Sequence, residues 1–356
     1  MNILHSLIVF ALAILPGQDA VKARSTAPAI DAQTKSQVLE TLAKELIERY
    51  IYPDRAKEID KALKEWTKTP EYTAIESPLI FAQKVNDLLK ASVTDAHLRF
   101  RYSAAPLPKR ERRDEPSPDE ERRFNEMVRR ANAGFEKVER LPGNVGYVMF
   151  RHFAEPEQMA RPLESAMTFL ANCEAFIIDL RQNGGGSPEG VRLFCSHFFG
   201  EKPVHLNDIY FREGEKVVKN EFWTLADLKG PRFPVAPVYV LTSKRTGSGA
   251  EECAYNFQQL KRGTIIGEST WGGANPGGTV RLSDHFDCFI PTGRAENPHS
   301  KKNWEGTGVS PDIAIDPAKA LQEAHTLAIK ALIEKTTDPE RKTELQNALE
   351  VVAKGG

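Results

Sequence analysis

The sequence predicts an α/β protein in which an α/β core follows a helical N-terminal region. Strand-like and helix-like segments alternate from residue 145 to residue 270, which is typical of such a core. Residues 175–180, AFIIDL, form a near-continuous apolar run that favours a strand covered on both faces. Glycine-rich turns follow two predicted strands, at the edge where open α/β sheets place their functional sites.

The N-terminal region predicts three helices and a short strand. Apolar residues recur at helical spacing through residues 32–66, with Pro53 separating two helices, and again through 78–92. Residues 98–102 then alternate like a strand. Residues 104–138 are instead rich in Arg, Glu, Asp and Pro, which favours a solvated linker or an exposed helix near 120–130.

The core elements follow from residue 145 onward. The predicted strands are 145–150, 175–180, 238–241 and 264–267, and the helices between them are 156–172, 188–199 and 250–257. A hairpin is expected at 279–291, and helices at 317–335 and 338–353. The predicted division is a signal peptide at 1–23, a helical cap at 24–102, a charged linker at 103–140, an α/β core at 141–335 and a C-terminal helix or tail at 336–356.

The first 23 residues have the pattern of a signal peptide. An apolar run at residues 7–15 is too short to span a bilayer comfortably, and Pro16-Gly17 ends it. Cleavage is expected after Ala23, with Ala20 as a second candidate. The pattern predicts export to the periplasm or the outside of the cell, and an uncleaved N-terminal anchor or a buried helix are the alternatives. No later segment is long and apolar enough to predict a membrane span.

Composition excludes several classes of partner. Lys and Arg number 48 against 49 Asp and Glu, so no basic surface for nucleic acid is expected, and the basic run at 109–113 is followed at once by acids. The four cysteines show no metal-binding spacing and sit in apolar contexts, which predicts small buried side chains and no metal. No cofactor is expected, and a disulfide among these cysteines stays open.

A serine in a tight turn is the first candidate for chemistry. The strand at 238–241 leads into Gly247-Ser248-Gly249, and a helix with Glu251 and Glu252 in its first turn follows. Such a turn can lift a serine hydroxyl above a sheet edge, with backbone N–H groups beside it. Local sequence alone fits an N-capping serine equally well.

The other parts of a serine site have weaker signals. Gly184, Gly185 and Gly186 follow a buried strand and can turn their amides toward a ligand, as can Gly249. No phosphate-binding or dinucleotide motif is present, which argues against nucleotide binding. Among eight histidines, only His97 is singled out, by its position between a helix and a strand.

Five motifs resemble those of the tail-specific, or C-terminal processing, serine peptidases. They are VTDAH at 93–97, IDLRQNGGG at 178–186, LTS to SGAE at 241–251, GE at 267–268 and GVSPD at 308–312. They occur in the family's order, and the family includes the tricorn core and the interphotoreceptor retinoid-binding proteins. The resemblance implies a crotonase-like (ClpP/crotonase) α/β core and a serine nucleophile at Ser248.

The resemblance is to the tricorn-like branch rather than to the branch with a Ser-Lys dyad. That second branch has a lysine base about 25 residues after the serine, and no lysine lies between Lys261 and Lys301 here. The tricorn-like branch implies that His97 is the base and that Glu305 orients it. The oxyanion would then be held by backbone amides of Gly185 or Gly186, together with Gly249.

Two departures from the family affect its expected chemistry. Ala96 stands where the tricorn-like branch has a serine before the histidine. The stretch between Tyr102 and Leu141 is too short and too charged for the family's peptide-binding PDZ domain, as in the retinoid-binding proteins.

The resulting hypothesis is an exported serine peptidase that cleaves peptides or unfolded protein tails through an acyl-enzyme. The alternative is a binding protein of the same fold that carries an apolar ligand. A third, an acyl-CoA enzyme of the crotonase kind, is disfavoured by the serine turn and by the lack of a basic cluster for coenzyme A.

Overall fold

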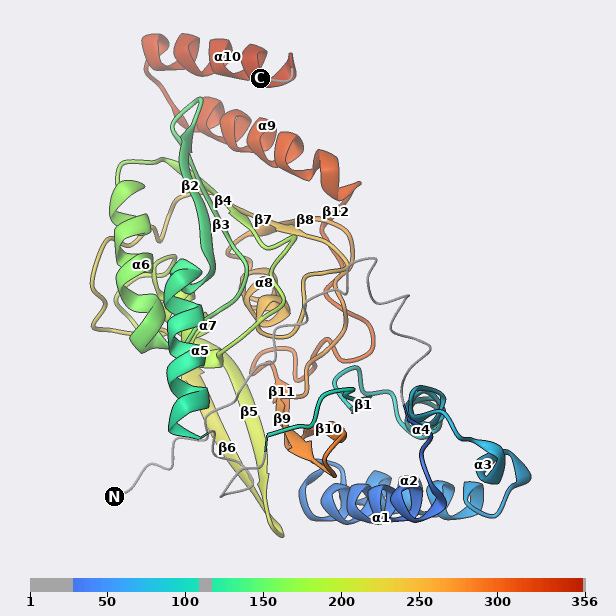
Figure 1. The fold of residues 1–356 in the computed structure, drawn as a ribbon. Coiled ribbons are helices and arrows are strands. Elements are labelled where there is room, and N and C mark those ends of the chain that lie inside the picture. The colour runs from blue at the N-terminus through green and yellow to red at the C-terminus, as the bar shows by residue number, and fades with distance from the viewer. Residues whose placement is uncertain (1–27, 109–116, 355–356) are drawn as a thin grey trace. The chain divides into compact units, whose positions relative to one another are not determined.

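The computed structural model describes residues 28–108 and 117–354 (Figure 1). The predicted signal peptide, residues 1–23, and the basic run at 109–113 lie outside the described residues. The chain divides into two compact units. We call residues up to 121 with 209–220 and 275–295 the helical unit, and residues 122–208, 221–274 and 296 onward the sheet unit.

Among its described residues, the helical unit contains four helices before its first strand: α1 (Ala32–Arg49), α2 (Pro53–Trp66), α3 (Pro70–Ala74) and α4 (Pro78–Ser92). Asp31 and Ser77 cap α1 and α4 by accepting a hydrogen bond from the backbone N–H three residues on. Proline begins α2, α3 and α4, where its missing N–H leaves no hydrogen bond unmade. The helices predicted at 32–66 and 78–92 are therefore present.

A three-stranded antiparallel sheet completes the helical unit. Its order is β1 (Arg99–Tyr102), β10 (Phe286–Pro291) and β9 (Gly277–Arg281), so the hairpin predicted at 279–291 pairs with a strand far earlier in the chain. Phe100 stacks on Phe286, with ring centroids 5.4 Å apart, and Phe81 of α4 packs edge-on against both. This aromatic contact joins the sheet to the helices.

The sheet unit is built on six strands in the order β12-β8-β7-β4-β3-β2. Neighbouring strands from β3 through to β12 pair in parallel, and only β2 is antiparallel to its neighbour. Their bounds are β2 (Phe135–Leu141), β3 (Val145–Phe150), β4 (Ala175–Asp179), β7 (Val238–Thr242), β8 (Thr264–Gly267) and β12 (Ile313–Ala314). The predicted mixed α/β class is confirmed.

Helices cover both faces of this sheet. Every residue of β4 and β7 is buried, as the continuous apolar runs predict. Ile177 and Leu241 pack with α9 (Pro317–Lys335), and α10 (Pro339–Ala353) packs on α9. Phe176 points to the opposite face, where it meets Phe198. The helices packed together on that side are α6 (Pro156–Phe169), α7 (Pro188–Ser196) and α8 (Gly249–Gln259).

The charged stretch after residue 103 contains three elements among its described residues. The helix expected near 120–130 is α5 (Pro118–Arg130), followed by a short 3₁₀ turn at Asn132–Gly134. Residues 135–141, which the composition did not mark as a strand, form β2 and pair with β3. All four cysteines are buried free thiols, as expected from their apolar contexts.

The remaining sheet carries the chain from one unit to the other. Its order is β11 (Gly293–Glu296), β5 (His205–Glu213) and β6 (Lys216–Trp223), and each strand has one end in each unit. Within residues 28–108 and 117–354, no helix combines the length and hydropathy that a bilayer crossing needs.

Candidate active site

Ser248 lies in a strained turn between a central strand and a helix. It follows β7 by six residues and occupies the N-cap position of α8. Its backbone has φ +53° and ψ −123°, a region that costs a non-glycine residue free energy. Strain of this kind is concentrated at functional sites, and a sharp strand-to-helix turn is what exposes a nucleophilic serine. Ser248 is therefore an N-cap by position with a conformation that capping does not require.

The three glycines predicted beside the serine approach it closely. Gly185 and Gly186 have φ +104° and +140°, as their motif predicts. A Cβ on Gly185 would lie 2.7 Å from the Gly249 nitrogen and 2.7 Å from Ser248 Cβ. A Cβ on Gly249 would lie 3.1 Å from the Gly186 nitrogen. The absence of side chains at these positions is what lets the two turns meet.

The glycine amides differ in their hydrogen bonds. The Gly185 N–H donates to Asn183 Oδ1 at 2.9 Å, and Asn183 in turn donates to the Phe150 carbonyl at 3.0 Å. Among the described residues no acceptor is recorded for the N–H groups of Gly186 and Gly249. Of the predicted oxyanion donors, Gly185 therefore has an amide that already donates within the protein.

A buried acid three residues after the serine holds the turn. The Glu251 side chain accepts the Ser248 N–H at 2.8 Å, and its carboxylate also accepts from Thr270, Gly272 and Gly273. Burial raises the pKa of Glu251 to about 7, although these four bonds act to lower it. The sequence marks Glu251 only as an acid in a first helical turn. The Ser-x-x-Glu spacing of a capping box was the signal that could have identified it.

Glu305 belongs to the same unit as Ser248. It lies in the loop before β12, half-buried, and its Oε2 accepts the Ala274 N–H at 2.5 Å. The neighbouring Trp304 donates its indole N–H to the Gly273 carbonyl at 2.8 Å. The loop at 272–274, where the lysine branch of the family has its base, here contacts Glu305 through its backbone.

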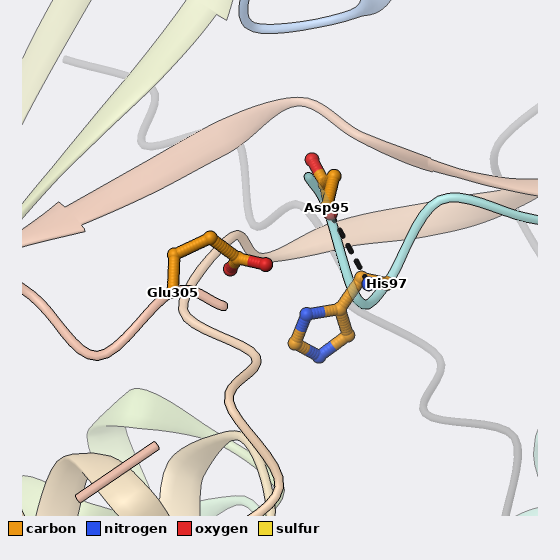
Figure 2. Close-up of side chains that lie close together, drawn as sticks. All are labelled: Asp95, His97 and Glu305. Atoms are coloured by element: carbon orange, nitrogen blue, oxygen red, sulfur yellow. Dashed lines mark hydrogen bonds between the residues drawn. The ribbon is translucent and has the colours of Figure 1, made fainter. Parts of the chain in front are cut away.

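His97 is positioned within the helical unit by Asp95. The Asp95 Oδ1 accepts the backbone N–H groups of His97, at 3.1 Å, and of Leu98, at 3.3 Å (Figure 2). Its Oδ2 accepts from the Tyr50 hydroxyl at 2.9 Å and from Asn275 Nδ2 at 3.0 Å. Asp95 is part of the VTDAH motif, but its role depends on partners 45 and 180 residues away, which local sequence does not reveal.

The imidazole of His97 is itself buried. It stacks on Phe289, with ring centroids 5.6 Å apart. Burial, helped by the nearby Arg99 charge, lowers the pKa of His97 to about 4. A neutral imidazole at ordinary pH is the protonation state that a general base requires.

The predicted residues are thus distributed over both units. Ser248, Gly185, Gly186, Gly249 and Glu305 lie in the sheet unit, whereas His97 lies in the helical unit. The triad of Ser248, His97 and Glu305 stays a prediction.

Comparison with known proteins supports the family predicted from the motifs. Residues 144–315 match the sequence model described as Peptidase family S41. The chain is 28% identical to the carboxyl-terminal-processing peptidase 2 of Arabidopsis thaliana chloroplasts over 189 residues, 48% of this chain and 33% of that protein. It is 29% identical to a putative tricorn-like protease C-terminal subunit of Sulfurisphaera tokodaii over 219 residues, 56% of this chain and 22% of that protein.

The fold is also shared with solved structures. A putative peptidase from Parabacteroides merdae superimposes with a TM-score of 0.56 at 17% identity, covering 84% of this chain and 96% of that one. The chain spans 33%, 40% and 35% of the length of three curated processing peptidases. The resemblance to the carboxyl-terminal processing peptidases that the motifs predict is therefore confirmed, and the match to peptidase family S41 covers just under half of the chain.

Proposed function

We propose that this protein is a serine peptidase that uses Ser248 as nucleophile, His97 as general base and Glu305 to orient the imidazole. The observation that carries the proposal is the Ser248 turn. A non-glycine residue at φ +53° stands beside two glycine amides, at the end of a central parallel strand. The match of residues 144–315 to a peptidase family adds support, since a fold alone does not specify chemistry.

The proposed mechanism forms and breaks an acyl-enzyme. Ser248 Oγ attacks the peptide carbonyl carbon while His97 accepts the hydroxyl proton. The oxygen of the tetrahedral intermediate binds the N–H groups of Gly186 and Gly249, which is our refinement of the set predicted from sequence. His97 returns the proton to the leaving amine, and water then hydrolyses the ester by the reverse sequence.

The substrate class is part of the proposal. We infer peptides or unfolded protein tails, because relatives that match this chain are named for carboxyl-terminal processing. Export to the periplasm or beyond, based on residues 1–23, is proposed with it, as is a crotonase-like arrangement of the sheet unit without a PDZ domain.

Covalent labelling tests the nucleophile directly. A fluorophosphonate should add to wild-type protein once, and peptide mapping by mass spectrometry should place the adduct on Ser248. Ser248→Ala should show no adduct and should not cleave a denatured-protein or peptide library. An unlabelled, inert wild type that still binds lipid-like ligands would instead support the binding-protein alternative.

A further inference from the structure

The Glu251 carboxylate makes four hydrogen bonds in the interior of the sheet unit. Glu251 has no exposed surface. One oxygen, Oε2, accepts from the Ser248 N–H at 2.8 Å and from the Gly273 N–H at 2.9 Å. The other, Oε1, accepts from Thr270 Oγ1 at 2.5 Å and from the Gly272 N–H at 2.5 Å. All four groups that contact the carboxylate donate a hydrogen bond to it. The surroundings of Glu251 therefore match an ionised carboxylate, which only accepts hydrogen bonds.

These bonds connect the serine turn to the loop at 270–274. The loop then continues to Glu305 through three further contacts. Trp304 Nε1 donates to the Gly273 carbonyl at 2.8 Å, the Gly306 N–H donates to the Gly272 carbonyl at 2.9 Å, and the Ala274 N–H donates to Glu305 Oε2 at 2.5 Å. A continuous set of hydrogen bonds therefore runs from Ser248 to Glu305 within one unit.

We propose that Glu251 is a positioning residue, which fixes the Ser248 turn and, through the loop at 270–274, the carboxylate of Glu305. The inference rests on the proposed function, because it assigns Glu251 a role in the same reaction. Glu251 acts through other residues and contacts no reacting atom. The strained conformation of Ser248 explains why such a positioning residue is needed. A non-glycine residue at φ +53° persists only when its surroundings hold it there.

The charge of Glu251 gives this role a measurable signature. The four groups that contact the carboxylate are neutral: three backbone N–H groups and a hydroxyl. A protonated carboxyl would turn an O–H toward one of these donors and lose one acceptor position. Because burial raises the pKa of Glu251 to about 7, its network should weaken as the pH falls through about 7. His97, with a pKa near 4, does not titrate in that range.

The experiment compares Glu251→Gln with Glu252→Gln as a matched control. The side-chain amide introduced by Glu251→Gln would present an NH₂ group to two of the four donors in either orientation. Glu252 is also buried in α8, and burial raises its pKa to about 8, so an amide there replaces a group that is already largely neutral at pH 7. We expect kcat of Glu251→Gln to fall on the order of 100-fold with KM nearly unchanged, whereas Glu252→Gln stays within about 3-fold of wild type.

The pH profile separates positioning from a general loss of structure. The fluorophosphonate labelling rate of wild type and of Glu252→Gln should rise with pH, with a midpoint near 7. In Glu251→Gln the labelling rate should show no such rise near pH 7. An unchanged kcat in Glu251→Gln, or a step near pH 7 that persists in that variant, would overturn the inference.

A third readout does not depend on turnover. In protein labelled with ¹⁵N-glycine, the amide resonances of Gly272 and Gly273 should shift together with a midpoint near pH 7, in wild type and in Ser248→Ala. If wild type fails to react with the fluorophosphonate but these amides titrate, the proposed function fails while the Glu251 network stands. If the amides do not titrate near pH 7, the pH dependence assigned to the Glu251 network is refuted even in an active enzyme, and the comparison of kcat between Glu251→Gln and Glu252→Gln decides the positioning role.

Discussion

At the scale of single residues, the Asp95 carboxylate accepts four hydrogen bonds within the helical unit. Asp95→Asn keeps one acceptor oxygen but places an NH₂ group where Tyr50 and Asn275 now donate. We expect the free energy of unfolding to fall by about 1–3 kcal/mol, because a buried donor is left without a partner. Urea denaturation measures this, and Asp87→Asn, on the exposed face of α4, should behave like wild type. Equal losses in both variants would contradict the role of Asp95.

The buried carboxyl group of Glu252 should make the free energy of unfolding depend on pH. Burial raises its pKa to about 8 from an ordinary value of 4.5, so the folded protein keeps the proton that the unfolded chain loses. Between pH 4.5 and 8 the folded state binds more protons, and the contribution of Glu252 to stability therefore declines as the pH rises through this window.

Replacing Glu252 by Gln removes this contribution. Urea midpoints measured at about pH 5 and about pH 8 should decline less with pH in Glu252→Gln than in wild type, and the variant should be the more stable of the two at the higher pH. If the urea midpoint of wild type declines over this pH range by as much as that of the variant, Glu252 ionises with an ordinary pKa and the prediction is wrong.

At the scale of elements, two glycines in the turn after β4, Gly184 and Gly186, should differ in how well they tolerate a side chain. A Cβ at Gly186 would lie 2.0 Å from the Phe153 carbonyl oxygen, and its φ is +140°. A Cβ at Gly184 would meet no heavy atom within 4 Å. Gly186→Ala should therefore lower the free energy of unfolding by at least about 2 kcal/mol, since backbone must move. Gly184→Ala should remain within about 0.5 kcal/mol of wild type in the same urea titration.

The strands show how far local sequence predicts this fold. β4 and β7 were predicted because strands covered on both faces have continuous apolar runs. β2 was missed because Glu136, Lys137, Glu139 and Arg140 resemble a solvated linker, and charge is also how an edge strand avoids pairing with other chains. The pairing of β1 with β10 was missed for a different reason. It joins segments far apart in the chain, such as Arg99 and Phe289, and no local pattern encodes such a contact.

For the candidate site, too, the sequence suggests some residues and not others. Ser248, the glycines, His97 and Glu305 came from short motifs, and the glycine conformations follow directly from residue type. Asp95, Asn183 and Glu251 were not singled out, because each acts through buried hydrogen bonds to distant backbone or side chains. Candidate reacting residues can thus be proposed from motifs, whereas the residues that form hydrogen bonds to them or to their turns require coordinates.

At the scale of the whole molecule, the proposed triad requires residues from both units. His97→Ala should reduce fluorophosphonate labelling of Ser248 on the order of 10²–10⁴-fold, the usual contribution of a general base. His285→Gln is the matched control, because His285 lies in the same unit and binds the Ser103 carbonyl. Circular dichroism should show both variants folded. Equal labelling of His97→Ala and wild type would exclude His97 as the base.

The three strands that pass between the units limit how such a protein can be recombined. Because β5, β6 and β11 each begin in one unit and end in the other, the helical unit consists of three separate stretches of chain. A gene fusion that exchanged only the first 121 residues with a relative would leave β9 and β10 behind, with Phe286, Cys288 and Ile290 facing a foreign partner. A productive chimera must exchange all three stretches together, so His97 can be transferred to a relative only along with β9 and β10 and not with the N-terminal stretch alone.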